Sequence, residues 1–347
     1  MIIVSQHTAT DLEHILQSMS YDRIFVLSDE HTQQQCVSIL KDIPALQDAV
    51  QMVVKPGESA KSLDTAVHLW KQLNEESATR HSLMLSVGGG MITDLGGFVA
   101  AAFKRGMQCV HVSTTLLGAV DAATGGKTAV NFEGYKNLIG FFHEPQHVIV
   151  ATDFFATLDT HQLLSGYAEM LKHALISSRD DWQKTIAWDT ETMPIDQLCL
   201  LLKRNIAIKQ RIVEDDPTEQ GKRKTLNFGH TIGHAIESWT HTTNQPQPHG
   251  YAVLWGMVAE LFLSHKKLGF PLLHLQQLIT LMKQAYGRPT FTCNDYNNLH
   301  RFMLHDKKNL DAKHINFTLL KEIGIPEINQ TASIEEIDEA LDFLREG

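Results

Sequence analysis

The first half of the chain alternates short apolar runs with stretches of helical periodicity. The apolar runs predict strands at residues 23–27, 52–54, 83–87, 109–112 and 148–150. Between them, apolar positions three and four residues apart predict helices over 32–40, 61–73 and 92–102. Because strands that alternate with helices form parallel sheets with both faces covered, we expect an α/β domain built on a mostly parallel sheet.

From about Thr160 the pattern changes to long amphipathic segments. These segments predict helices over residues 162–175, 198–213, 251–268, 272–285 and 334–345. Strand-like sequence is scarce there until residues 315–320. We therefore predict two domains, an α/β domain over residues 1–158 and an all-helical domain over residues 159–347.

Composition and charge narrow the function classes. The 347 residues are 43% hydrophobic, which is enough for two packed cores, and they include 30 Lys and Arg against 40 Asp and Glu. A net charge of −10 argues against a nucleic-acid partner, because such partners need a basic surface. A small anionic substrate would require a local cationic pocket.

Targeting signals and cysteine usage predict a cytoplasmic protein with no membrane partner. The start MIIVSQHTAT lacks the features of a signal peptide, and the longest apolar stretch, at 98–103, is too short to span a bilayer. The four cysteines are scattered without a CxxC pair, which is typical of a reduced compartment and argues against a cysteine-rich zinc site.

A glycine-rich segment, SVGGGMITD at residues 86–94, follows one predicted strand and begins the next predicted helix. Glycines there let the backbone approach a pyrophosphate, whose charge the helix N-terminus favours. The pattern is not GxGxxG, so the segment is consistent with a nucleotide site of the Rossmann type and with a simple tight turn. Upstream, Glu58 and Lys61 in PGESAK fit no more than a helix-capping arrangement.

A second polar segment runs from Thr114 to Gly140 and is rich in predicted loop. It combines paired glycines with Asp121, Lys127, Lys136 and Asn137. Ammonium groups and an amide beside glycines suit the oxygens of a phosphate or a carboxylate. The alternative is a solvated loop with ordinary surface lysines.

The third segment, RKTLNFGHTIGH, has the most specific pattern. Arg223, Asn227, His230 and His234 follow one another at spacings of 4, 3 and 4 residues. We expect them on one face of a helix, by its period of 3.6 residues. Two glycines in the segment make such a helix costly, which favours a functional stripe over an exposed polar face.

Imidazole and carboxylate side chains suggest a metal site. Glu169 lies on a predicted apolar helix, and Lys172 follows one turn later, so this pair also fits a simple helix salt bridge. Imidazole with carboxylate and an open position suits catalytic zinc. His249 begins the next long helix. The HxxxH spacing lacks the Glu of HExxH, so a zinc protease is not supported.

Together these segments resemble the 3-dehydroquinate synthase family of sugar phosphate cyclases. The resemblance rests on motifs in order from Gly88 to Lys308: GGGMITDLGGF, KRG, TTLLGAVDAATGGKTAVN, GYKNLIG, GYAEMLKH, RKTLNFGHTIGHAIE, PHG and DKK. Weaker similarity at Asp29 and Glu58 extends it over nearly the whole chain. Each motif alone is weak, and the ordered set is specific.

The resemblance implies a Rossmann-like NAD-binding domain and a helical domain with the active site in the cleft between them. It implies zinc, replaceable by cobalt, on Glu169, His230 and His249. The NAD residues would be Asp29, Glu58, Lys61, Gly89, Gly90, Asp94, Thr114 and Thr115, with Asp121, Lys127 and Lys136. The substrate residues would be Asp121, Lys127, Lys136, Asn137, Lys172, Lys209, Arg223, Asn227, His234 and Lys307. Arg105 would reach the phosphate site of the other subunit in a homodimer.

The implied reaction converts 3-deoxy-D-arabino-heptulosonate 7-phosphate to 3-dehydroquinate and phosphate, a step of the shikimate pathway. NAD would oxidise one hydroxyl transiently, and zinc would polarise the resulting ketone as a Lewis acid. Phosphate elimination, return of the hydride, ring opening and an intramolecular aldol closure would follow. We assign proton relay near the leaving phosphate to His234, since imidazole exchanges protons at neutral pH.

Three other functions share parts of this inventory. A sister cyclase acting on another sugar phosphate would share zinc, NAD and most lysines, but Arg223 suits a substrate carboxylate and favours the quinate pathway. A metal-dependent polyol or glycerol dehydrogenase could use the spacing from Glu169 to His173, but it does not need so many lysines. An NAD-sensing regulator would not need every expected ligand and relay residue.

One residue departs from the family pattern. Many members have an acidic residue after the His-Gly pair, whereas this chain has Tyr251 after His249-Gly250. An aromatic ring there would repack the start of the helix. Any supporting role of a carboxylate at this position is therefore in doubt.

Overall fold

The computed structural model describes residues 1–133, 135–192, 194–243, 245–304 and 314–347. The chain divides into two compact units, Met1–Gly166 and Tyr167–Gly347. This division falls inside helix α6 (Thr160–Ser177), whereas the domain boundary predicted from the sequence precedes that helix.

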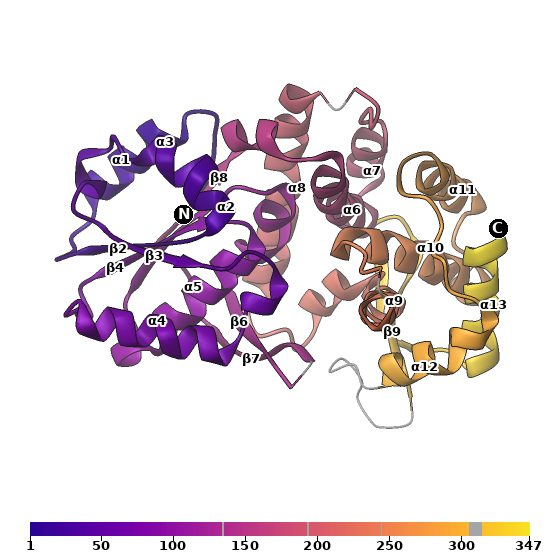
Figure 1. Ribbon diagram of the computed structural model, residues 1–347. Coiled ribbons are helices and arrows are strands. Elements are labelled where there is room, and N and C mark those ends of the chain that lie inside the picture. The colour runs from indigo at the N-terminus through magenta and orange to yellow at the C-terminus, as the bar shows by residue number, and fades with distance from the viewer. Residues whose placement is uncertain (134, 193, 244, 305–313) are drawn as a thin grey trace. The chain divides into compact units, whose positions relative to one another are not determined.

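The first unit is built on a six-stranded sheet (Figure 1). Its strands lie in the order β1-β8-β5-β4-β2-β3. All its strand pairs are parallel, as the alternation of strands and helices predicted. The strands are β1 (Ile2–Ser5), β2 (Ile24–Asp29), β3 (Val50–Val54), β4 (Leu83–Gly88), β5 (Gln108–Ser113) and β8 (His147–Ala151). The sequence pattern predicted five of them and missed β1.

Helices cover both faces of this sheet (Figure 1). One face packs on α1 (Thr8–Ser18) and on α3 (Ser38–Leu40), which continues the short helix α2 (Glu30–Thr32), and the other face packs on α4 (Leu63–Glu75) and α5 (Gly90–Ala102). Successive β2 residues alternate between the two cores: Ile24 and Val26 enter one, and Phe25 and Leu27 enter the other. This period of two is the geometry of a strand buried on both faces.

Part of the segment predicted as loop-rich is an antiparallel hairpin. Strand β6 (Lys127–Phe132) pairs with β7 (Tyr135–Phe142) in a separate two-stranded sheet. The loop prediction failed because β6 buries Thr128, Ala129 and Val130 consecutively, so the alternation of a one-sided strand is absent. Its two lysines and Asn137 therefore stand on strands, which fix their backbone.

The second unit is mostly helical, and the prediction of an all-helical domain is wrong in one respect, because the unit contains the antiparallel pair β9 (Asn316–Glu322) and β10 (Ile325–Thr331). Its helices beyond α6 are α7 (Arg179–Ile186), α8 (Ile195–Asp215), α9 (His230–Thr242), α10 (His249–Leu268), α11 (Leu272–Leu281), α12 (Tyr296–Leu304) and α13 (Ile334–Glu346). Among the described residues, no helix is long and apolar enough to cross a membrane.

The predicted polar stripe along one helix at 223–234 is wrong. Lys222–Asn227 forms a separate 3₁₀ helix, and α9 begins only at His230. Gly229, between them, adopts a left-handed backbone (φ +78°), and a Cβ there would lie 2.4 Å from Met257 Cγ. Because the helix breaks at this glycine, Arg223 and Asn227 do not share a helix face with His230 and His234.

Candidate active site

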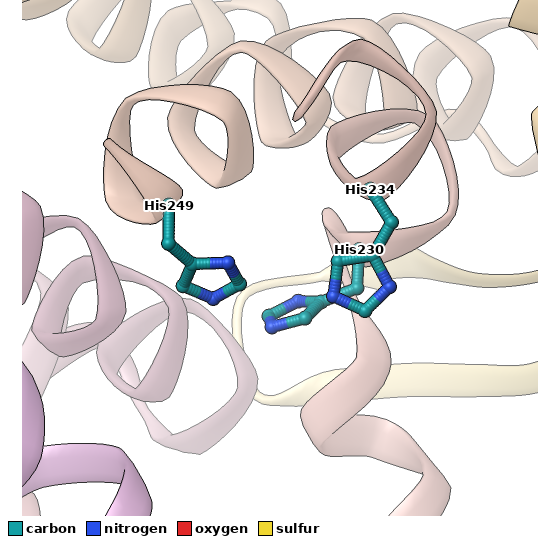
Figure 2. Close-up of side chains that lie close together, drawn as sticks. All are labelled: His230, His234 and His249. Atoms are coloured by element: carbon teal, nitrogen blue, oxygen red, sulfur yellow. The ribbon is translucent and has the colours of Figure 1, made fainter. Parts of the chain in front are cut away.

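A carboxylate and three imidazoles gather in the second unit. Glu169 comes from α6, His230 and His234 from α9, and His249 is the first residue of α10. His230 Nε2 lies 3.2 Å and His249 Nε2 3.4 Å from Glu169 Oε1. The three imidazoles turn toward one another, and their ligand atoms lie within 4.8 Å of one another (Figure 2). The structure thus brings the residues expected at a metal into one cluster.

The hydrogen bonds of two imidazoles leave room for a cation. His230 Nδ1 lies 3.0 Å from the Phe228 carbonyl oxygen, and His249 Nδ1 lies 3.2 Å from Glu237 Oε2. Both partners are acceptors, so each Nδ1 carries a hydrogen and each Nε2 is the ring atom that faces the Glu169 carboxylate. A proton or a metal ion can lie between such a nitrogen and a carboxylate oxygen, so the donor set fits a metal.

The electrostatics of the cluster agree with that geometry. Glu169 is fully buried, and among the described residues its oxygens have ion-pair contacts but no hydrogen bond of normal geometry. Burial acts to raise the pKa of Glu169, but the neighbouring Lys172 ammonium and His230 hold that pKa well below its usual range. Burial also opposes a charge on His249, yet Glu237 and Glu169 raise the pKa of His249 to about 10. The site therefore favours a positive charge between its carboxylates.

Two carboxylates that the sequence analysis missed support these ligands. Glu237, on α9 two turns after His230, is buried and contacts His249 Nδ1. Glu260, buried on α10, accepts backbone N–H bonds from Gly229, Thr231 and Ile232 at 2.6, 3.0 and 3.1 Å. A carboxylate at a helix N-terminus satisfies its free N–H groups, so Glu260 fixes the backbone that carries His230.

Tyr251 has a packing role. It is buried, and its ring meets Tyr286 at a centroid distance of 4.9 Å and Trp255 at 6.2 Å. The carboxylate that many family members carry there is absent, while Glu237 approaches His249 from the neighbouring helix.

One buried lysine contacts the cluster, and another lies on helix α8. Lys172 forms an ion pair with Glu169 one turn earlier on α6, and both side chains are inaccessible to solvent. Lys209, also buried, lies on α8. His173 Nδ1 contacts Asn205 Oδ1 at 2.7 Å, and Asn205 Nδ2 donates to the Met170 carbonyl at 2.9 Å. These contacts tie α8 to α6, so the two lysines have fixed backbones.

Arg223 and Asn227 lie on the 3₁₀ helix that precedes α9. Arg223 is buried and donates through Nη1 to the Pro217 carbonyl at 2.7 Å. Asn227 Nδ2 donates to Glu219 Oε1 at 2.9 Å. Glu219 was not predicted; it has a left-handed backbone (φ +61°), uncommon for a residue other than glycine. Only its position next to the motif could have pointed to it.

The first unit gathers the predicted nucleotide residues at one edge of its sheet. Asp29, the Gly89-Gly90 pair and Thr114-Thr115 stand at the carboxyl ends of β2, β4 and β5. The chain runs outward from β2 to β3 and then returns to β4 beside β2. Such a reversal of strand order is where open α/β sheets bind ligands.

The glycine turn brings the backbone close to its neighbours. A Cβ on Gly89 would lie 3.0 Å from Thr115 Cγ2, and one on Gly90 would lie 2.9 Å from Ala122 Cβ. Gly89 precedes α5 and supplies no side chain to cap it. The N–H groups that begin α5 therefore suit an anion such as a pyrophosphate.

Glu58 and Lys61 do not cap α4, contrary to that interpretation. Ser62 is the capping residue, and its Oγ accepts from Thr65 N at 3.2 Å. Lys61 is buried, and its Nζ lies 2.7 Å from Asp94 Oδ2 on α5 and 3.6 Å from Glu58 Oε1. Burial opposes the ammonium, but Asp94 and Glu58 raise the pKa of Lys61. This ammonium stays charged beside the glycine turn.

The remaining predicted residues have different surroundings. Lys127 lies on β6, and Lys136 and Asn137 on β7; all three are exposed. Asp121 belongs to the helical turn Gly118–Ala122. Arg105 is exposed in the turn after α5, where Lys104 and Arg105 both have positive φ angles. Lys307 lies outside the described residues.

Two family models match the chain. The model described as 3-dehydroquinate synthase N-terminal matches residues 51–165. The model described as 3-dehydroquinate synthase C-terminal matches residues 166–309.

Relatives named 3-dehydroquinate synthase match along most of the chain. One from Parabacteroides distasonis is 46% identical over 346 residues, which cover 100% of this chain and 98% of the relative. One from Listeria monocytogenes is 40% identical over 317 residues, which cover 89% of this chain and 84% of the relative.

Solved structures of cyclases share the fold. A 2-deoxy-scyllo-inosose synthase complexed with carbaglucose-6-phosphate, NAD+ and Co2+ has a TM-score of 0.87 at 24% identity, covering 100% of this chain and 96% of that one. The 2-epi-5-epi-valiolone synthase of Streptomyces hygroscopicus subsp. jinggangensis, with NAD+ and Zn2+ bound, also has a TM-score of 0.87 at 24% identity, covering 99% and 96%.

Proposed function

Since the chain belongs to the 3-dehydroquinate synthase family, we propose that it converts 3-deoxy-D-arabino-heptulosonate 7-phosphate to 3-dehydroquinate and phosphate. The observation that carries the proposal is the buried Glu169 carboxylate faced by His230 and His249 and paired with Lys172. A reaction that needs a polarised carbonyl would use the carboxylate and the two imidazoles, which can hold a metal. A reaction that needs a bound dianion would use the Lys172 ammonium.

The metal, zinc or cobalt, would be held by Glu169, His230 and His249. The shared carboxylate oxygen and the orientation of both Nε2 atoms support this assignment. When bound, the metal supplies a Lewis acid for the substrate oxygens. His234 lies beside the ligands, its ring centroid 5.0 Å from that of His230, and would move the proton near the leaving phosphate.

The first unit would hold NAD, which supplies a transient oxidant when bound. The glycine turn at Gly89-Gly90 and the N-terminus of α5 would receive the pyrophosphate. The residues proposed around the dinucleotide are Asp29, Glu58, Lys61, Asp94, Thr114, Thr115, Asp121, Lys127 and Lys136. The adjacent carboxyl ends of β2, β4 and β5 support this placement.

Cationic and amide side chains would hold the substrate. A carboxylate or a phosphate compensates for the desolvation of buried guanidinium and ammonium groups. Arg223, whose planar fork matches a carboxylate, would bind that end of the substrate. The other proposed substrate residues are Asp121, Lys127, Lys136, Asn137, Lys172, Lys209, Asn227, His234 and Lys307.

The enzyme would work as a homodimer in the cytoplasm, where sugar phosphates and NAD are available. Arg105 would then reach the phosphate site of the partner subunit. The Arg105 side chain is exposed, and Lys104 and Arg105 both have the left-handed backbone that is strained in residues other than glycine. These features support a functional role for Arg105.

The test is release of inorganic phosphate from the heptulosonate phosphate by purified protein with zinc and catalytic NAD. We expect many turnovers per NAD and no NADH at completion, because the hydride returns to the substrate. Accumulation of stoichiometric NADH would instead support a dehydrogenase. Turnover of another sugar phosphate in place of the heptulosonate would indicate a sister cyclase.

Chelation tests the metal in the same assay. Removing the metal should abolish phosphate release, and zinc should restore it. His230→Ala should lose stoichiometric zinc, whereas His241→Asn, which changes an exposed imidazole on the same helix, should keep it. A His230→Ala protein that retained zinc and normal turnover would overturn the ligand assignment.

A further inference from the structure

Asn131 stands where strand β6 leaves its own hairpin. The register of β6 with β7 shifts between Val130 and Phe132, on either side of this residue. Asn131 N instead donates to the Lys61 carbonyl at 2.8 Å, and Asn131 forms a parallel bridge with Ser62. A bulge re-aims a side chain, so the irregularity presents the Asn131 amide to the Glu58–Ser62 segment.

Both ends of this amide are used. Nδ2 donates to Glu58 Oε1 at 2.9 Å, and Oδ1 accepts from Asn137 N at 2.9 Å. Asn137 has a left-handed backbone (φ +53°), a conformation that needs support from its surroundings. The partners fix the orientation of the amide, because a carboxylate only accepts and a backbone N–H only donates.

The contacts continue on the far side of Glu58. Its Oε1 lies 3.6 Å from Lys61 Nζ, and that ammonium lies 2.7 Å from Asp94 Oδ2 at the start of α5. One continuous chain of polar contacts therefore runs from Asp94 through Lys61, Glu58 and Asn131 to the backbone beside Lys136. Asn131 is the link between the two halves of this chain.

We propose that Asn131 is a positioning residue that couples the nucleotide residues to strand β7, which carries Lys136 and Asn137. The inference rests on the proposed function, which places Glu58, Lys61 and Asp94 at NAD and Lys136 and Asn137 at the substrate, whose phosphate oxygens suit an ammonium and an amide. Each ligand orders one end of this chain of contacts. The second ligand therefore binds a site that is already partly ordered, and its binding loses less conformational entropy. The coupling is reciprocal by thermodynamic linkage.

The experiment measures NAD binding to the full-length protein by calorimetry, with and without saturating inorganic phosphate. For wild type we expect phosphate to tighten NAD binding by roughly fivefold or more, as is typical of site coupling. Asn131→Ala should bring this ratio close to one and raise KM for the heptulosonate phosphate more than it lowers kcat. The matched control is Glu133→Gln, an exposed change in the same hairpin, which should keep the wild-type ratio.

A pair of conservative changes keeps the test informative if Asn131→Ala fails to fold. Asn131→Asp retains an acceptor for Asn137 N but places a carboxylate against Glu58, so coupling should be lost. Adding Glu58→Gln restores a donor–acceptor pair with the roles exchanged, and the ratio should recover. The ratio compares each protein with itself, so a change in its absolute NAD affinity cancels.

The results separate this inference from the proposed function. Wild-type phosphate release with the heptulosonate tests the function alone. An unchanged ratio in both Asn131→Ala and Asn131→Asp, no tightening in wild type, or no recovery in the double variant would overturn the role of Asn131 while leaving the function standing.

Discussion

At the scale of single residues, the orientation of a metal-ligating side chain matters as much for metal binding as its chemical identity. The second nitrogen of His249 contacts Glu237, whose carboxylate fixes the ring and raises its basicity. Motif matching singled out His249 but not Glu237, since nothing in the sequence says which acid meets which Nδ1. The sequence does show a carboxylate two helical turns after His230, but its contact with His249 on α10 appears only in the fold.

Glu237→Ala should therefore weaken zinc binding by about 10- to 100-fold, the usual cost of removing a partner behind a ligating imidazole. Competition with a chromogenic chelator measures the affinity directly. Glu237→Gln should fall between wild type and Glu237→Ala, because its amide oxygen still accepts from Nδ1. Wild-type zinc affinity in Glu237→Ala would show that the contact orients nothing.

A buried histidine of the sheet makes stability depend on pH. His111 on β5 is almost fully buried, and burial, with His143 nearby, lowers its pKa to about 4. The unfolded chain takes up this proton near pH 6.5, whereas the folded protein resists until about pH 4. The contribution of His111 to the free energy of unfolding is thus fully present above pH 6.5, and it is lost as the pH drops toward 4.

We expect wild type to lose about 3 kcal/mol more unfolding free energy than His111→Gln between pH 7 and pH 4. Urea denaturation at the two pH values measures this difference, in which the titration of the carboxylates cancels. Parallel losses in the two proteins would mean that His111 is protonated as readily in the fold as outside it.

At the scale of elements, glycine and carboxylate placement decides where α9 begins. The spacing of Arg223, Asn227, His230 and His234 predicted one continuous helix, because periodicity does not reveal a left-handed glycine. Contacts with α10 decide the outcome: Gly229 N donates to Glu260, and a Cβ on Gly256 would lie 2.0 Å from the Gly229 carbonyl. Tertiary packing overrode the local pattern.

Five strands of the large sheet and the long helices α6, α8 and α10 were predictable, since their apolar positions follow the period of the element. Helix α1 and the hairpin strands β6 and β7 were missed. Strand β1, which has only four residues, was also missed, whereas the predicted helix at 32–40 is confirmed, because α2, a π-helical stretch at Gln33–Val37 and α3 follow one another without a break.

Glu260→Ala should destabilise the second unit by about 3 kcal/mol or more, because three buried N–H groups lose their acceptor. Glu214→Ala, an exposed change on α8, should stay within about 0.5 kcal/mol of wild type. Thermal unfolding of the metal-free proteins compares them without a contribution from ligand binding. Equal melting temperatures for Glu260→Ala and Glu214→Ala would show that solvent replaces the lost acceptor.

At the scale of the whole molecule, the proposed shared active site predicts complementation. Arg105→Ala and Lys136→Ala should each be inactive. After subunit exchange about half the dimers are mixed, and each has one intact site, so activity should return to roughly a quarter of wild type. If exchange is demonstrated by a mass tag and no activity returns, Arg105 acts within its own subunit.

The position of β1 bears on how the sheet is made. Strand β1 pairs with β8, and Met1 N donates to the carbonyl of Gln146, 145 residues away in the sequence. Of the six strands, β1 leaves the ribosome first and its partner last. At ordinary rates of synthesis it waits on the order of 10 s as an unpaired apolar segment. Strands β2, β3, β4 and β5 can pair before β8 is made, so the addition of β8 and β1 at this edge is a late event, and the nascent chain has most need of a chaperone at β1.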